Sequence, residues 1–593
     1  MNSSFESLSI ELLFELFDYL SPFDLFRIFI NLNNRLNAIV YSYPLRLDFR
    51  SICRSKFDFI CRHLQPKQVI SLILCDEYVP DRVKLFLNHF PHFKEQFLQL
   101  QSITLIEAET ITFIDLPASV SSLSIRIYDV DDYYYENYIS KILSQQAKVL
   151  THLKIDSKDL YDLIDIHFPA LTYLIISGGY YYDGNYIDVS VPLENIDVHS
   201  LIQQWQCFLT HLYLVIDNKI QYSTFNLDRF SHCLTHLTLH FYQGKKELIF
   251  HFQSNILGIQ ISFLCLERCL IKLSQLIKFT CQATGSWDLI DGKRWEQLLL
   301  KTQIIRFNFK FTFNLILEIS SILEPFRSLF WLEQRHWYVG CYQDETEKGT
   351  IIYSIPRFQT RTLKYPSAKF PHMTTAPSII EQNLFYSSRI NYFSFDMNKL
   401  ITPVDYRFHQ VKSLTLSGSS LLSLNILSSI VDLQQVQYLD VSNINRLLPN
   451  ELENLIAHTP RVIHLSMKFD PLFIIPSQIR YLLLDGLGRS ISLDRLSYTI
   501  SSVERLEISM ASKQMIIDVI DRFNGLENLD IYFDDGDLDD DCMTICKGVS
   551  IDWLIKHTHR LKSYDFTCRY SREFYPSIYL SFGDRRKENN NQD

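Results

Sequence analysis

The hexapeptide LTHLTL, residues 234–239, has an apolar residue at its first, fourth and sixth positions, and this spacing recurs along the chain. Close copies start at Leu150, Leu171 and Leu209. Because the last two apolar residues flank a single intervening position, each copy predicts a short strand with one buried face. Looser copies start at Val69, Leu100, Val120, Leu193, Ile304, Val411, Val436, Val462, Ile479, Val503, Leu526 and Leu561.

Stretches with helical spacing lie between the copies. In residues 513–525, Met515, Ile516, Val519 and Ile520 form an apolar stripe, and Gly525 follows where a helix cap is expected. From residue 411 to residue 526 the copies start 17 to 26 residues apart, mostly within the roughly 20–29-residue period of leucine-rich repeats.

A unit of helix, turn and short strand buries its apolar face only by stacking on its neighbours. We therefore predict an α/β fold: an irregular leucine-rich-repeat solenoid with parallel strands on the concave side and helices outside. The alternative is a doubly wound α/β protein. Such a fold is expected to carry a glycine-rich turn after an early strand, and only a GxG in residues 484–490 comes near.

The repeat pattern fades between residues 305 and 395. Apolar segments at residues 337–339 and 351–353 flank the polar stretch QDETEKG, residues 343–349. This arrangement predicts a β-hairpin insertion near 336–355, or a seam between two repeat blocks. The predicted organisation is a helical unit in 1–48, a first repeat block in 49–310, an insertion or seam in 311–400, a second repeat block in 401–582 and a disordered tail in 583–593.

Composition favours a folded intracellular protein, in the cytoplasm, the nucleus or both. Hydrophobic residues make up 47% of the chain and charged residues 21%, as in folded proteins. The net charge of −10 argues against a nucleic-acid partner, since such proteins are usually basic. The twelve cysteines include no CxxC pair, which indicates buried, reduced thiols. No apolar stretch without charge is long enough to predict a membrane span.

The chain lacks the motifs of the common enzyme classes: GxSxG, HExxH, a P-loop and the kinase signature are absent. The acidic run 534–541 fails as a calcium loop, because Phe533 and Ile531 stand where oxygen ligands are required, and Cys542 where a glutamate is required. We predict no catalytic residue, no metal site and no cofactor.

Histidine recurs at the third position of the repeated phrase. Because side chains alternate along a strand, this position points away from the buried face and onto the concave side of a stacked array. Recurrence of the same residue in a repeated sequence explains these histidines more simply than a metal site or a pH sensor does. An enzyme that uses them is the least favoured alternative. The candidate target-binding residues of this face are His152, Tyr173, His211, Tyr213, His236 and His464.

The N-terminal stretch LSIELLFELFDYLSPFDLFRI, residues 8–28, combines two apolar helical stripes with a helix-start signal at Ser21, Pro22 and Asp24. A third helix is expected over residues 33–40. Three short helices bury too little surface to be stable alone. Their apolar excess is therefore covered either by the first repeat, which they would cap, or by another protein.

This stretch resembles an F-box, whose usual form is LPxELLxxIFxYLxxxDLxR. Ser9 replaces the proline of that form, and the third helix lacks the tryptophan of many members. The matching residues are Leu8, Glu11, Leu12, Leu13, Phe17, Tyr19, Leu20, Asp24, Leu25 and Arg27, with Leu16 in place of the usual isoleucine and Pro22 where many members carry proline.

The resemblance implies the substrate-recognition subunit of an SCF-type ubiquitin ligase. The F-box would dock on a Skp-family adaptor, and through it on a cullin, while the repeats hold an unknown target protein. Catalysis would belong to the ubiquitin-conjugating enzyme. The alternative is a non-catalytic leucine-rich-repeat scaffold whose N-terminal helices only cap the solenoid. The implied adaptor-binding residues are Leu8, Leu12, Leu13, Leu16, Leu20, Pro22 and Leu25.

Overall fold

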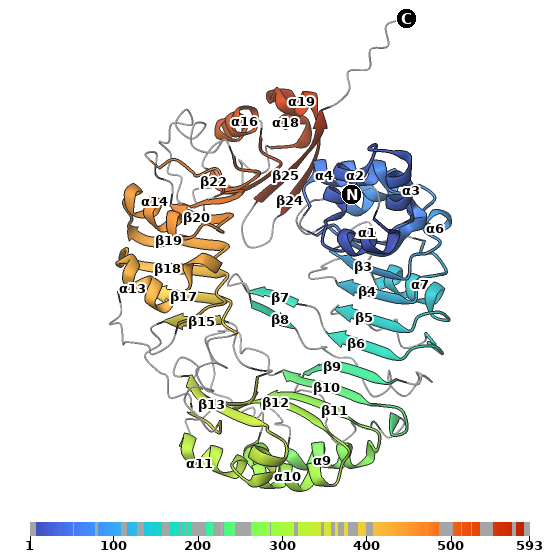
Figure 1. Ribbon diagram of the computed structural model, residues 1–593, viewed down its shortest axis with the longest axis vertical. Coiled ribbons are helices and arrows are strands. Elements are labelled where there is room, and N and C mark those ends of the chain that lie inside the picture. Colours follow the sequence, from blue (N-terminus) through green and yellow to red (C-terminus); the bar gives the residue numbers. More distant parts are fainter. Residues whose placement is uncertain are drawn as a thin grey trace, which may run out of the picture.

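Two long β-sheets follow one another along the chain and curve into a ring, with the helices on its outer side (Figure 1). Helices pack about 8–10 Å apart and strands only about 4.8 Å apart, so a stack of helix–strand units curves with its strands inside. The computed structural model describes residues 8–50, 52–76, 81–107, 115–126, 136–156, 166–177, 180–183, 187–190, 209–217, 227, 230–242, 262–284, 286–313, 318–344, 349–356, 358, 362–365, 373–376, 389–398, 407–468, 470, 473–485, 502–510, 513–523, 525–533, 549–571 and 577–585.

Within the described ranges the first sheet has 13 strands, and neighbouring strands from β1 to β12 all pair in parallel. Three antiparallel strands, β14, β13 and β16, extend it beyond β12. In spatial order the strands are β1 (Leu45–Asp48), β2 (Val69–Cys75), β3 (Ser102–Ile106), β4 (Ser122–Arg126), β5 (His152–Asp156), β6 (Tyr173–Ser177), β9 (His211–Asp217), β10 (His236–Tyr242), β11 (Lys278–Thr284), β12 (Arg306–Phe313), β14 (Gly349–Ile355), β13 (Tyr338–Asp344) and β16 (Met373–Thr374).

In the part of the chain that the structure describes, the second sheet has ten strands, which are parallel from β15 to β23 and end in two antiparallel strands. A separate antiparallel pair consists of β7 (Tyr180–Asp183) and β8 (Ile187–Ser190). In spatial order the second sheet is β15 (Thr362–Tyr365), β17 (Tyr392–Asp396), β18 (Ser413–Ser420), β19 (Tyr438–Arg446), β20 (His464–Lys468), β21 (Tyr481–Asp485), β22 (Arg505–Met510), β23 (Asn528–Phe533), β25 (Ser577–Arg585) and β24 (Tyr564–Ser571).

Successive copies of the repeated phrase lie side by side in register. His211 on β9 pairs with His236 on β10, which pairs with Lys278 on β11. Leu237 and Leu239 of β10 are fully buried, as the alternation predicts. The predicted α/β fold with large parallel sheets is confirmed, and it is consistent with a leucine-rich-repeat-like solenoid.

The helices cover the outer side of the ring (Figure 1). Ile516, Val519 and Ile520, part of the stripe predicted from the sequence, are the buried residues of α16 (Lys513–Arg522). The other helices of more than five residues beyond the N-terminal unit are α4 (Arg54–His63), α5 (Arg82–His89), α7 (Glu136–Gln146), α9 (Phe263–Lys272), α10 (Gly292–Leu300), α13 (Leu424–Ile430), α14 (Pro449–His458) and α18 (Ile551–His557) among the described residues.

The segment predicted as an insertion or seam divides between the two sheets. Strands β13 and β14 form an antiparallel hairpin where the sequence predicts one, and β14 pairs with β12. Strands β15 and β17 instead begin the second sheet. At the C-terminus, β25 extends to Arg585, three residues into the predicted tail, because it pairs with β24. Residues 586–593 lie outside the described residues.

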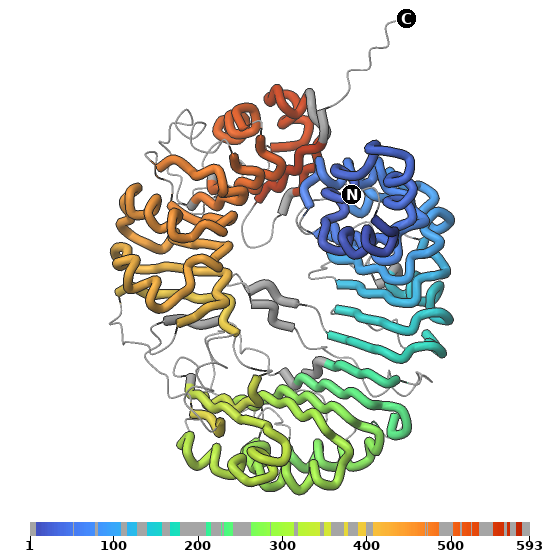
Figure 2. Tube along the Cα trace, viewed as in Figure 1, coloured from blue at the N-terminus to red at the C-terminus, as the bar shows by residue number. Residues whose placement is uncertain are grey.

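The two ends of the ring meet. Ser55 Oγ, in α4, donates a hydrogen bond of 3.1 Å to Glu527 Oε1, which directly precedes β23. Lys56 Nζ lies 4.0 Å from Glu504 Oε2, next to β22. Arg569 Nη1 of β24 donates to the backbone oxygen of Asp76, after β2, at 3.5 Å. In Figure 2 the chain makes one circuit, and side-chain contacts rather than a continuous sheet close it.

Gly292→Ala is expected to lower the free energy of unfolding by about 1–3 kcal/mol, the usual cost of overpacking. Gly292 is the first residue of α10, and a Cβ there would lie 2.6 Å from the backbone oxygen of Pro325. Urea unfolding measures the change. Lys293→Ala, at the exposed next position, is the control and should be near neutral. Equal stability of the two variants would contradict the packing described.

Candidate binding surfaces

Three N-terminal helices begin at side-chain caps. They are α1 (Ile10–Phe17), α2 (Pro22–Phe29) and α3 (Asn34–Ser42). Ser9 Oγ accepts a hydrogen bond of 3.4 Å from the backbone N–H of Leu12. Ser21 Oγ accepts one of 3.1 Å from Asp24, and Asn33 Oδ1 one of 2.8 Å from Leu36. Ser9, which departs from the F-box pattern, therefore has a local role as the cap of α1.

The inner faces of these helices join the core of the first repeats. Leu13 of α1 is fully buried, and Leu25 of α2 is 1% exposed. The Phe23 ring of α2 meets Phe59 of α4 edge-on, with centroids 5.3 Å apart. Leu13 and Leu25 belong to the implied adaptor-binding set, and for these two residues the prediction is wrong, because packing in the core removes both side chains from solvent.

The outer side of α1 leaves apolar side chains open to solvent, next to the exposed Glu11 and Glu15. Leu12 and Leu16, one helical turn apart, are 48% and 42% exposed. Leu8, Leu20 and Pro22 are half-buried beside them. The outer face of α1 is defined as Leu8, Leu12, Leu16 and Tyr19. Further exposed apolar side chains of this helical unit are Ile10, Ile28 and Leu32.

A row of rings crosses the inner side of the first sheet. His152, Tyr173, His211 and His236 pair in register across β5, β6, β9 and β10. The ring centroids of His152 and Tyr173 lie 5.3 Å apart, and those of Tyr173 and His211 5.4 Å apart. The stacked rings of His211 and His236 are only 4.0 Å apart. The structure thus brings four of the six predicted residues into one row.

Each of the three histidines is fixed by the threonine before it. Thr151, Thr210 and Thr235 place Oγ1 at 2.9 Å from Nδ1 of the following histidine. The same hydroxyls donate to backbone oxygens of the preceding strand's copy, at 3.0–3.1 Å. The rings are therefore held in place, and Nε2 is the ring nitrogen that a ligand can use.

Two cations continue the same row. Lys278 pairs with His236, and Arg306 of β12 pairs with Lys278. Partial burial lowers the pKa of His236, and His211, Lys278 and Arg306 lower it further by repulsion. Neither cation is among the residues predicted from the sequence. Arg306 occupies the third position of the copy that starts at Ile304, and Lys278 that of LIKFTC, residues 276–281, which has the same spacing.

Tyr213 and His464 lie off this row. Tyr213 is two residues along β9 from His211, and its hydroxyl lies 3.1 Å from Nδ1 of His240. His464 belongs to the second sheet, between Tyr438 and Tyr481 on the neighbouring strands. Their centroids lie 4.3 and 5.6 Å from that of His464. The six predicted residues therefore belong to two separate surfaces.

A charged cluster follows His464 along the second sheet. Arg505 of β22 forms an ion pair with Asp530 of β23, with Nη2 and Oδ2 2.5 Å apart. Burial raises the pKa of Asp530, and Arg505 opposes that shift. Burial and the charge of Asp530 both raise the pKa of Glu507. The cluster carries two carboxylates against one guanidinium.

His464 is expected to make folding pH-dependent. Burial, and then Arg505, lower its pKa to about 4. Because this value lies below the unfolded pKa of about 6.5, the stabilisation is present above pH 6.5 and is lost as the pH falls toward 4. Between about pH 7 and pH 5, the wild-type protein should lose roughly 1–2 kcal/mol of unfolding free energy through His464, and the His464→Gln variant should lack that part of the loss.

Urea unfolding at both pH values measures this difference between the two proteins. Ser413→Gln, at the same phrase position on β18, should keep the wild-type loss; an unchanged pH dependence in His464→Gln would contradict the assignment.

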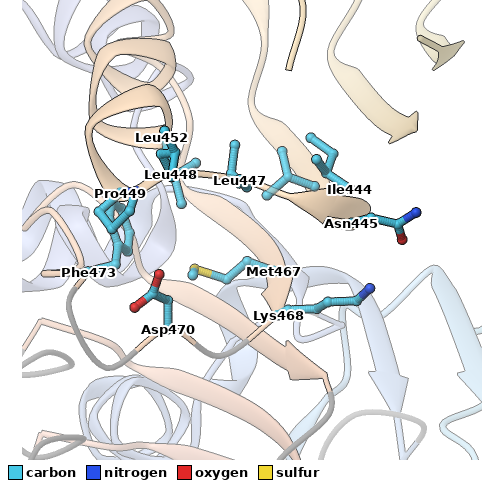
Figure 3. Close-up of a pocket in the computed structure, with 11 residues that line it drawn as sticks. Ile444, Asn445, Leu447, Leu448, Pro449, Leu452, Met467, Lys468, Asp470 and Phe473 are labelled. Carbon is cyan, nitrogen blue, oxygen red and sulfur yellow. The ribbon is translucent and has the colours of Figure 1, made fainter. Parts of the chain in front are cut away.

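A small apolar cavity lies between α14 and the ends of β19 and β20 (Figure 3). Its volume is about 140 Å³, close to that of an engineered cavity that holds benzene. Ile444, Met467 and Phe473 are buried in its wall. Lys468 and Asp470 also line it. No sequence signal singled it out, because its wall combines Val441 and Met467, the last positions of two copies of the phrase, with residues of α14 and of the segments that follow those copies.

The cysteines fit the expectation of thiols rather than disulfides. The nine that the structure describes are all free, and five of them are buried. Burial raises the pKa of Cys281 and that of Cys341, the latter to about 12. These two thiols are therefore poor nucleophiles.

Within the described ranges, no three His, Cys, Asp or Glu side chains are placed to share a metal ion. The acidic run 534–541 lies outside those ranges. Of the helices that the structure describes, none combines the length and the apolar character needed to cross a bilayer.

Comparisons with known proteins give little beyond this geometry. No protein-family model and no curated protein matches the chain. A solved structure that does match is the crystal structure of a TLR13–ssRNA13 complex, at 10% sequence identity and a TM-score of 0.22. The match covers 74% of this chain and 48% of that chain, so this protein spans about half the length of its structural neighbour. The strand register and the layers of strands and helices given above therefore define the repeat fold.

Proposed function

We propose that the protein is the substrate-recognition subunit of an SCF-type ubiquitin ligase, with α1–α3 as an F-box. The observation that carries the proposal is the two-sided character of α1. Leu13 and Phe17 are buried in the core, while Leu12 and Leu16 face solvent. One face packs into the core that the helical unit shares with the first repeats, and the other is left for a Skp-family adaptor.

The exposed face favours this function over a plain cap. A unit that only ends a solenoid needs one apolar face, and its outer face is expected to be polar. The outer face of α1 instead carries two exposed leucines and Tyr19, which is 88% exposed. Exposed apolar side chains that gather on one helix are typical of protein–protein contact.

A scaffold whose N-terminal helices only cap the repeats is the second candidate. It is supported by the shared core, in which Leu13, Leu25 and Phe57 belong to one cluster with the first sheet. The same contacts are expected in an F-box protein whose helices are docked on its repeats. The shared core alone therefore does not separate the two functions.

In the proposed complex the chain contributes binding and no catalysis. The adaptor links it to a cullin, the inner surface of the ring holds the target, and a ubiquitin-conjugating enzyme acts from elsewhere in the complex. The reducing environment inferred from the sequence corresponds to the cytoplasm or the nucleus. No cofactor is required.

Reconstitution tests the proposal. The purified full chain, a Skp-family adaptor and the cullin N-terminal domain are mixed and separated by size-exclusion chromatography with light scattering. The proposal predicts a complex with one copy of each protein. Elution of the chain apart from the adaptor would overturn it and leave the scaffold function.

A further inference from the structure

The inner side of the first sheet carries an excess of positive charge, although the chain as a whole is acidic. We define the basic inner face as the surface of strands β4–β6 and β9–β12 that points away from the helices. Its histidine row leads into Lys278 and Arg306. The cations of this face are Arg126, Lys154, Lys278, Arg306 and Lys310.

Two acidic residues occupy inner positions of the described strands of this face, against the five cations. They are Asp217, the last residue of β9, and Asp156 of β5, which is fully buried. The carboxylate of Asp156 accepts a hydrogen bond from Ser177 and lies 3.1 Å from Lys154 Nζ and 3.4 Å from Arg126 Nε. A ligand therefore meets a surface with positive charge in excess.

The second sheet has an acidic balance at its inner positions. Asp396, Asp440, Glu507 and Asp530 on β17, β19, β22 and β23 stand against Arg505 of β22 and Lys468 of β20 among the side chains that the structure describes. The two sheets have the same repeat architecture, so this contrast comes from the residues chosen and not from the fold. It distinguishes the first sheet as the surface for an anionic ligand.

The ring geometry favours a peptide over a nucleic acid. Nucleic-acid surfaces offer aromatic faces on which bases stack. Here His211 and His236 cover one another at 4.0 Å, and Tyr173 lies beside both His152 and His211. The row therefore offers a ligand the edges of the rings and the histidine Nε2 atoms. These nitrogens can accept hydrogen bonds from the N–H groups of an extended backbone, while Lys278 and Arg306 can pair with carboxylates.

We propose that the basic inner face binds an extended acidic segment of the target protein. This inference rests on the proposed function, since it names the class of target that the repeats hold. The segment lies along the row from β5 to β12, with its carboxylates at Lys278 and Arg306.

A binding assay with the full chain tests the inference without the adaptor. Fluorescence anisotropy compares a labelled peptide of alternating glutamate and alanine with its glutamine counterpart and with a single-stranded RNA. The glutamate peptide should bind at least about tenfold more tightly than the glutamine peptide, because charge complementarity dominates the contact. Its affinity should fall as salt is added.

Paired charge reversals locate the site. Lys278→Glu with Arg306→Glu should weaken the glutamate peptide about tenfold or more. Arg268→Glu with Lys301→Glu changes the net charge equally, at exposed positions in and just after the outer helices of the same repeats, and should have little effect. The variant that combines Leu12→Asp with Leu16→Asp should bind the peptide as the wild type does. A failure of adaptor binding can therefore be distinguished from a failure of peptide binding.

Four results would overturn the inference: no binding of the glutamate peptide, equal binding of the glutamine peptide, equal loss in both charge-reversal variants, or tighter binding of the RNA at Lys278 and Arg306. Circular dichroism of the inner-face variant excludes unfolding as the cause of a loss. His236→Ala, which removes a ring edge but no cationic side chain, gives a second readout and should weaken the peptide by several-fold.

Discussion

Leu12→Asp combined with Leu16→Asp is expected to weaken binding to a Skp-family adaptor by about 100-fold or more, with the unfolding temperature unchanged. Both side chains are more than two-fifths exposed, so the fold does not depend on their burial. Burying a leucine at an interface contributes about 1.5–3 kcal/mol, and each 1.4 kcal/mol is a factor of about ten in affinity. A carboxylate in the same place would also have to lose its water.

Titration calorimetry with the purified adaptor measures this loss. Leu264→Asp is the matched control, because Leu264 is a 45% exposed leucine on α9, and this variant should bind as the wild type does. Leu13 is unsuitable as a test, since its substitution would unpack the core. Wild-type affinity in the double variant would contradict the assigned outer face of α1.

Trp295→Ala is expected to lower the free energy of unfolding by about 3–5 kcal/mol, the range for removing a large buried aromatic side chain. Trp295 of α10 is fully buried. Its ring centroid lies 4.8 Å from that of Phe263 and 4.7 Å from that of Phe307. Its Nε1–H donates to the backbone oxygen of Leu289 at 2.9 Å, and that oxygen would lose its partner.

Urea unfolding followed by circular dichroism measures the effect. Trp287→Ala is the control, because Trp287 is 48% exposed and should lose less than about 1 kcal/mol. Trp295→Phe should fall between the two, since it keeps the aromatic packing without the hydrogen bond. Equal stability of the two alanine variants would contradict the packing of α10 on β12.

The strands and their register could be predicted because a single local rule produces them. An apolar residue at positions four and six of the phrase fixes which face is buried, and Leu237 and Leu239 follow it. The same rule placed His152, His211 and His236 on one face. The fading of the phrase predicted an insertion or a seam ahead of His464 but did not decide between the two, and the structure places His464 in a second sheet.

Closure of the ring and the division of the N-terminal leucines could not be predicted. Ser55 and Glu527 are 472 positions apart, and no local pattern relates them. In α1, the 3.6-residue period gives apolar residues at both Leu12 and Leu13. Only the packing of α1 against α2 and the end of α3, seen in the contacts of Phe17 with Phe29 and Tyr43, decides which face of α1 turns inward.

Hydroxyl-radical footprinting of the full chain, with and without the Skp-family adaptor, shows whether the outer face of α1 binds the adaptor. We expect the adaptor to slow oxidation of Leu12, Leu16 and Tyr19, while the exposed Leu264 and Leu300 react as before. Unchanged oxidation of Leu12 and Leu16 at saturating adaptor would contradict this expectation.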